Sequence, residues 1–358
     1  MKTLACLLAF ACCAFGQEAE AGFDLRGSFT GAAVYSHLLS QPPRQESPLN
    51  GGFQAILYPT WKLSSHWSFT GAVQVRSRPY FREDFSDTTG RGVKADILQA
   101  NLTYARVWKR NAVTVRVGQM TSAFGAFLLR YDPAVNPLTQ MPLAYGYYYK
   151  PVTNLGLMGA QGDVTLGKTD FRAQFVNSSP ANRRSIFDRD QYGSWAGGMG
   201  YTILQGFRVG ASGYRGPYLH RGYEFYFPGE ARPRDLPGFA YGLDVQWGRG
   251  PWNVHGELQR FTMTYRQIPT FTQHTGYAEV RRTLTPRWYA ATRLEYLRAS
   301  AFPGSEAYEI AAGFRPSRTQ IVKFGYAIQR GQTIRGTLAN AAAIQWIADL
   351  HLLSVTGK

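Results

Sequence analysis

The sequence predicts an all-β fold, a transmembrane antiparallel β-barrel of about sixteen strands. Three observations support this fold class. Apolar and polar side chains alternate over segments of roughly ten residues along most of the chain. No segment after the first twenty residues is apolar enough for a transmembrane helix, although 15% of the residues are aromatic. The connections between the alternating segments are short and long in turn, which is typical of barrels that span a membrane.

The N-terminus predicts export. Lys2 supplies a basic start, residues 4–15 form an apolar run too short to cross a bilayer, and Ala14 to Gly16 offers small residues for cleavage. We therefore expect a signal peptide at residues 1–16 and a barrel at 17–358. A second small-residue site at 19–21 leaves the cleavage point open.

All three cysteines, at positions 6, 12 and 13, lie in the predicted signal peptide. The mature chain therefore has no disulfide, no thiolate metal site and no thiol nucleophile. Cys12 also suggests lipidation, but Ala9 stands where a lipoprotein signal usually has Leu.

Each of the first five strands is predicted from apolar residues at every second position. They are expected at residues 23–35, 53–63, 67–76, 98–104 and 113–119. Tight polar turns at 64–66 and 109–111 join two of the pairs.

Four further strands follow a long interruption, at residues 153–166, 171–177, 195–204 and 207–214. The last seven are expected at residues 239–247, 252–265, 272–284, 288–299, 308–314, 322–328 and 342–352. The clearest alternation is in 239–247, where Phe239, Tyr241, Leu243, Val245 and Trp247 share one face.

The interruption covers about thirty residues between 120 and 151 and shows neither strand nor helix periodicity. A loop of that length without secondary structure is uncommon in a compact domain and usually functional. It is the third long connection in chain order. With both termini on the periplasmic side, it is expected on the extracellular side.

Arginines in the strands predict which face lines the lumen. A Lys or Arg on the lipid face costs roughly 2 to 4 kcal/mol at the membrane midplane. Some arginines lie between apolar residues whose side chains point to the opposite face of the strand. We therefore expect these arginines to point inward, or to lie near the rim, where the cost is small. They are Arg26, Arg76, Arg116, Arg172, Arg208 and Arg293.

Tryptophans near the predicted strand ends match the aromatic belts that membrane proteins place at the two interfaces. Six of them are Trp67, Trp108, Trp195, Trp247, Trp252 and Trp288.

The pattern resembles the bacterial outer-membrane porin family over the whole mature chain, in strand number and in the position of the longest loop. The resemblance implies a water-filled channel for passive diffusion of small hydrophilic solutes, a third loop that folds into the barrel, and a homotrimer among outer-membrane lipid and lipopolysaccharide. If the loop folds inward, Arg130, Asp132 and Lys150 lie at the constriction, with Asp132 holding Arg130 in place.

A short motif is similar to the strand-to-loop segment of porins related to the phosphate-selective type. It is Val115-Arg-Val-Gly-Gln119 followed by Phe124-Gly125. Two departures matter. Those proteins use lysine ladders, whereas this chain has 8 lysines against 31 arginines. The family also ends on an aromatic residue, whereas this chain ends on Lys358. Because of the first departure, phosphate specificity is not expected, and the second is a departure from the family's usual assembly signal.

The formal net charge of +16 favours anions if the excess arginines line the lumen. The alternative places them in outer loops, near lipid phosphates. Arg183, Arg184, Arg232 and Arg234 fit that alternative.

Two rival functions are an outer-membrane lipid hydrolase and a plugged structural or adhesive barrel. The best catalytic candidates share one face of a strand, and they are Asn253, His255, Glu257 and Gln259. No G-x-S-x-G elbow and no second His-rich segment accompany them. We therefore expect no catalytic activity, no metal or cofactor, and no nucleic-acid partner.

Overall fold

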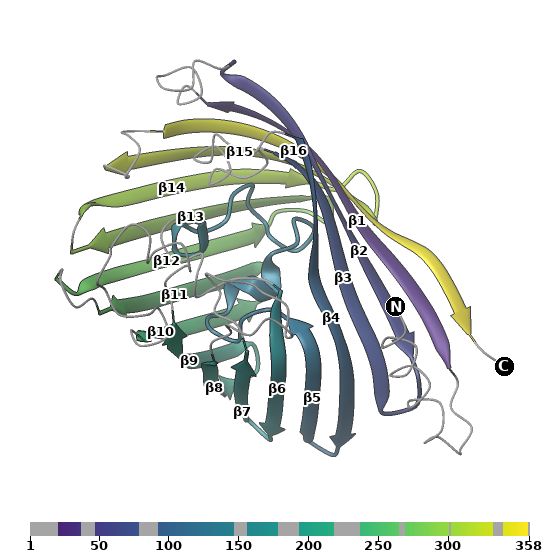
Figure 1. Ribbon diagram of the computed structural model, residues 1–358. Coiled ribbons are helices and arrows are strands. Elements are labelled where there is room, and N and C mark those ends of the chain that lie inside the picture. Colours follow the sequence, from purple (N-terminus) through teal and green to yellow (C-terminus); the bar gives the residue numbers. More distant parts are fainter. Residues whose placement is uncertain are drawn as a thin grey trace.

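The computed structural model describes residues 21–36, 47–78, 92–146, 156–177, 193–217, 237–264, 269–300, 302–331 and 339–356. Sixteen antiparallel strands close into one barrel, in which β1 pairs with both β2 and β16 (Figure 1). The predicted antiparallel β-barrel of about sixteen strands is confirmed.

The strands have the following bounds. They are β1 Gly22–Ser36, β2 Leu49–Lys62, β3 Trp67–Arg78, β4 Gly92–Trp108, β5 Asn111–Met120, β6 Leu157–Leu166, β7 Thr169–Val176, β8 Ser194–Leu204, β9 Phe207–Pro217, β10 Pro237–Arg249, β11 Trp252–Met263, β12 Phe271–Thr283, β13 Trp288–Ala299, β14 Phe302–Phe314, β15 Gln320–Gly331 and β16 Ala339–Thr356.

The two ends of the barrel differ in their connections. The first residue of β1, Gly22, pairs with Lys62 and with Thr356, so the start of β1 and the end of β16 lie at the same end of the barrel (Figure 1). All seven connections at that end are two to five residues long. At the other end, seven of the eight connections have seven residues or more, and β13–β14 is the exception with two.

Some strands begin earlier or later than the alternation predicts. β4 starts at Gly92 and β14 at Phe302, both about six residues before the predicted starts, whereas β6 starts at Leu157, four residues later. Ser305 and Glu306 break the apolar alternation, yet they pair with β13 and β15. Backbone pairing with two neighbours extends a strand past the segment whose outer face is apolar.

The outer surface is apolar because alternate side chains of each strand point outward. In β13, Trp288, Leu294 and Tyr296 are exposed, whereas Arg293 and Glu295 between them are buried. Trp108, Trp252 and Trp288 are exposed beside short turns, and Trp195 is exposed near the other end. No described helix is long and apolar enough to cross a membrane.

The apolar core lies inside the ring of strands and is supplied largely by residues 121–146, which we call the inner segment. The inner segment contains no strand and two single turns of helix, η3 (Phe127–Arg130) and α2 (Leu143–Gly146). Phe124, Phe127 and Leu138 are fully buried. Figure 1 shows this teal segment within the barrel.

Candidate functional site

The inner segment enters the lumen along the wall formed by β7 and β9. The Ala123 amide donates to Oε1 of Gln174 on β7 at 3.0 Å. The Gly125 amide donates to Oγ of Ser212 on β9 at 3.2 Å. The entrance of the segment is therefore tied to inward-facing side chains of the strands next to its own hairpin.

Gly125 makes a turn that other residues would strain. Its φ is +76°, in the region that favours glycine, and a Cβ there would lie 2.0 Å from the Tyr145 hydroxyl oxygen. Because residue 125 is glycine, the start of the inner segment can lie in close contact with Tyr145 near its end.

Glu257 on β11 holds the end of the inner segment. The Tyr145 hydroxyl donates to Oε2 of Glu257 at 2.5 Å, and Tyr277 and Gln259 each donate to the same carboxylate at 2.7 Å. Burial, and then the charge of Glu257, raise the pKa of Tyr145 well above its ordinary value, so the hydroxyl stays protonated and donates.

Glu309 on β14 binds the middle of the inner segment. One carboxylate oxygen accepts the backbone amide of Thr139 at 2.8 Å, its hydroxyl at 2.7 Å and the Gln140 amide at 3.1 Å. The other oxygen accepts from Arg293 at 2.9 Å. A fully buried carboxylate thus accepts two backbone amides of the inner segment.

Arg293 itself is fully buried and belongs to this anchor. It donates to Glu295 and to Glu309 at 2.9 Å each, to Glu279 at 3.4 Å, and to the Gln140 carbonyl at 2.9 Å. Glu295 also accepts the backbone amide of Leu143. The predicted inward direction is observed, but here the guanidinium contacts protein rather than an open channel.

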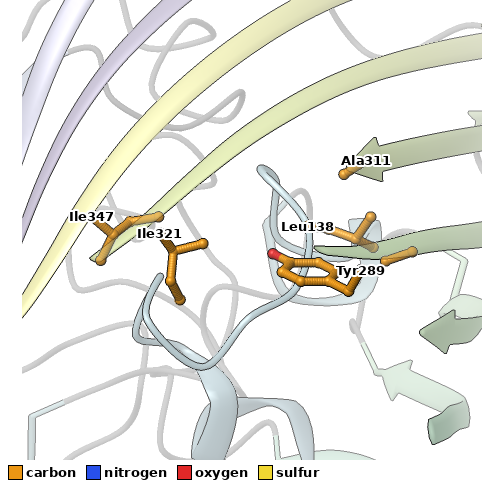
Figure 2. Packing of buried hydrophobic residues seen from close by; sticks show 6 residues of the cluster. Leu138, Tyr289, Ala311, Ile321 and Ile347 are labelled. Carbon is orange, nitrogen blue, oxygen red and sulfur yellow. The ribbon is translucent and has the colours of Figure 1, made fainter. Parts of the chain in front are cut away.

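Lys323 on β15 binds the same region through carbonyl oxygens. Its ammonium donates to Pro133 and Asn136 at 2.5 Å each. Leu138 belongs to a buried apolar cluster with Tyr289, Ala311, Ile321 and Ile347, which Figure 2 shows. Apolar contact and charge therefore fix the inner segment to the wall formed by β13 to β16.

The inner segment bridges opposite walls at residues 130–132. Arg130 forms an ion pair with Glu279 on β12 and donates to the Tyr277 hydroxyl at 3.1 Å. Asp132 accepts from Ser28 on β1 at 2.8 Å and from Tyr58 on β2 at 2.5 Å. The expectation that Asp132 holds Arg130 is wrong, because each finds its partner on a different wall.

The wall from β5 to β10 carries a ladder of alternating charges. Arg116 and Arg172 both pair with Asp163, at 2.5 and 2.9 Å. Arg208 pairs with Asp170 at 2.6 Å and with Asp244 at 2.9 Å. Side chains of the ladder remain about one-eighth to one-third exposed. The charged side chains of this wall are in contact with solvent, whereas those of β11 to β14 that bind the inner segment are buried.

The remaining predicted site residues have varied positions. Arg26 is exposed and pairs with Asp349 at 3.1 Å, and Arg76 is buried on the face that it shares with Gln74. Lys150 lies outside the described residues, as do Arg183, Arg184, Arg232 and Arg234.

Sequence reasoning missed the role of the residues that hold the inner segment, one of which, Glu257, was named only as a catalytic candidate. They are Glu257, Glu279, Glu295, Glu309 and Lys323. A signal was present for one of them, because Glu295 has the same strand parity as Arg293, which was expected to point inward. The others required knowledge of which strand faces which part of the loop.

The catalytic candidates on β11 do not form the contacts expected of a catalytic pair. Glu257 is bound by Tyr145, Tyr277 and Gln259, and within the described part of the chain it forms no hydrogen bond with His255. Among the described residues, no three His, Cys, Asp or Glu side chains form a group that could hold a metal ion.

Comparison with known proteins finds structural but not sequence similarity. No protein-family model and no curated protein sequence matches the chain. Among solved structures, the outer membrane channel DcaP of Acinetobacter baumannii is 11% identical, with a TM-score of 0.63 over 94% of this chain and 99% of that one.

Pseudomonas putida OprB is 9% identical, with a TM-score of 0.63 over 92% of this chain and 94% of that one. The trimer form of OmpT, an outer membrane protein of Vibrio cholerae, is 9% identical, with a TM-score of 0.61 over 92% and 100%. Similarity at this identity shows a common fold. It agrees with the closed sixteen-strand barrel described above.

Proposed function

We propose that the chain forms a water-filled channel in an outer membrane, through which small hydrophilic solutes diffuse passively. The observation that carries this proposal is the difference between its two surfaces. The outside of the barrel is apolar, whereas the inward wall from β5 to β10 presents ion pairs to solvent beside the inner segment. A charged lumen favours water and ions over lipid.

The inner segment acts as the constriction, with Arg130 and Asp132 bridging the lumen. Passage lies on the β5–β10 side, where Arg116, Arg172 and Arg208 line it. Export by a signal peptide, residence among lipid and lipopolysaccharide, and a homotrimer belong to the same proposal. The fold shared with outer membrane proteins, one of them a trimer form, supports them.

A weak preference for anions is part of the proposal. Most lumen arginines have carboxylate partners, which cancels much of their field. The terminal nitrogens of Arg172, however, have no hydrogen-bond partner in the described part of the chain. Reversal potentials in a salt gradient test the preference, and cation selectivity would contradict it.

The test of the channel is planar-bilayer conductance of the refolded protein, with and without residues 122–148. The proposal expects stable conducting steps that become larger on deletion, because the inner segment narrows the lumen. Conductance only after deletion would support a plugged barrel instead. Silence of both proteins, with correct folding verified by circular dichroism, would contradict a channel.

A further inference from the structure

A recess of about 180 Å³ lies between the inner segment and the wall formed by β7 to β10. Its wall carries Asp170, Arg172, Arg208 and Asp244, and Ala126 and Leu129 of the inner segment form its other side. A cavity needs only about 10 to 15 Å³ of such volume to hold one water molecule, so this recess can hold several. The recess is therefore large enough for a small organic molecule.

Glycines create the space for the charges around this recess. A Cβ on Gly200 of β8 would lie 2.0 Å from Nη2 of Arg208 and 2.5 Å from Asp170. A Cβ on Gly210 of β9 would lie 1.9 Å from Asp244. Because these positions have no side chain, Arg208 reaches across β8 to Asp170 on β7. The positions of these three charged side chains are therefore fixed by the strands that carry them, β7, β9 and β10.

The recess presents two positive and two negative side chains, so its formal charge is balanced. Arg208 uses Nε, Nη1 and Nη2 on its two aspartates. Arg172 uses only Nε, on Asp163, so among the described residues its Nη1 and Nη2 have no partner. These two donors are available to a carboxylate.

An acceptor for a cation lies close to those donors. Asp170 and Arg172 are two residues apart on the same face of β7, roughly 6.6 Å between Cα atoms. The Asp170 side chain is 34% exposed, so its oxygens can accept further hydrogen bonds beside those from Arg208. The apolar side of the recess is Leu129, which is exposed although it is a leucine.

We propose that this recess binds a small zwitterion that carries an ammonium and a carboxylate on one carbon and a short apolar side chain, as an α-amino acid does. Arg172 binds the carboxylate, Asp170 the ammonium, and Leu129 contacts the side chain. A ligand with one charge satisfies only one of the two partners. The inference deepens the proposed channel function, because it names a class of solute that pauses beside the constriction.

Binding is tested without conductance, by saturation-transfer NMR on the full refolded chain in detergent micelles. The probes are alanine, propionate, which lacks the ammonium, and ethylammonium, which lacks the carboxylate. We expect alanine to bind at least about tenfold more tightly than either analogue, since each lost charge-assisted hydrogen bond is costly. Equal affinities for the three probes would overturn the proposal.

Two variants should shift the preference in opposite directions. Asp170→Asn should weaken alanine and strengthen propionate, whereas Arg172→Gln should weaken alanine and strengthen ethylammonium. A folding defect would weaken all three probes alike, so this crossed pattern is specific to the site. Arg298→Gln, at an exposed arginine on β13 that does not line the recess, is the matched control and should leave alanine binding within about twofold. An uncrossed pattern would overturn the assignment.

The outcome is independent of the channel test. A protein that conducts in bilayers but gives no alanine signal would overturn this inference and leave the channel in place. A protein that binds alanine but never conducts would keep the site and contradict the channel.

Discussion

The two halves of the lumen wall use similar residues for different purposes. On β11 to β14, the carboxylates of Glu257, Glu295 and Glu309 are buried and accept hydrogen bonds from the inner segment. On β6, β7 and β10, the aspartates pair with arginines and remain partly exposed. The first group holds polypeptide in place, whereas the second remains in contact with solvent.

The difference teaches that inward direction alone does not define a pore-lining residue. Arg293 and Arg208 both point inward from strands with clear alternation. Arg293 is fully covered by the inner segment, and Arg208 is 27% exposed. Whether a charge contributes to stability or to permeation is decided by the segment that packs on it.

The largest effect is expected on the covered half, from Glu309→Ala. The change leaves the Thr139 and Gln140 amides without their acceptor and removes one partner of the buried Arg293. We expect a loss of about 3 to 5 kcal/mol in the free energy of unfolding, measured by denaturant titration in micelles, and a larger, noisier conductance.

The control for this variant is Glu306→Ala on the same strand. Glu306 is exposed and lies 3.6 Å from Arg298, so its loss should cost less than about 1 kcal/mol. Equal stability of the two variants would show that the inner segment is not held by Glu309.

A smaller effect is expected where the inner segment begins, from Gly125→Ala. The new Cβ must displace the Tyr145 hydroxyl, and the residue must adopt a positive φ. We expect a loss of roughly 1 to 3 kcal/mol together with increased conductance, because the contact with Glu257 is disturbed.

Gly250→Ala separates these two causes. Gly250 also has a positive φ, +56°, but a Cβ there would meet no atom within 4 Å. It should therefore reproduce the backbone strain without changing conductance. An increase in conductance by Gly250→Ala as large as that of Gly125→Ala would contradict the role given to Tyr145.

The smallest effect on stability is expected on the exposed half, from Arg208→Gln. Its partners Asp170 and Asp244 remain in contact with solvent, so we expect about 1 kcal/mol or less. Selectivity should nevertheless move toward cations, because two carboxylates lose their counter-charge. Reversal potentials measure this shift, and Arg26→Gln, whose pair with Asp349 is more exposed, should shift them less.

The fold could be predicted from the sequence to a greater extent than the site. Alternation of apolar residues identified sixteen strands and the inward face of arginines such as Arg172, because lipid and lumen select opposite side chains. The partners of those charges depend on strand register. Arg116 and Arg172 meet at Asp163 only because β5, β6 and β7 are paired at those positions.

The path of the inner segment was beyond prediction for the same reason. Arg130 and Asp132 are two residues apart, so a local contact between them was expected. The structure instead brings each to a strand more than a hundred residues away in the sequence. Tertiary context decided between a local ion pair and two distant ones.

The bridge at residues 130–132 also determines an order of assembly. Asp132 binds Ser28 at a sequence separation of 104, and Thr139 accepts from Gln345 at a separation of 206. The first contact needs β1 and the second needs β16, and contacts of such separation form late in folding because chain closure costs entropy. We therefore expect the inner segment to reach its final position late in folding, after the strands that hold it have paired.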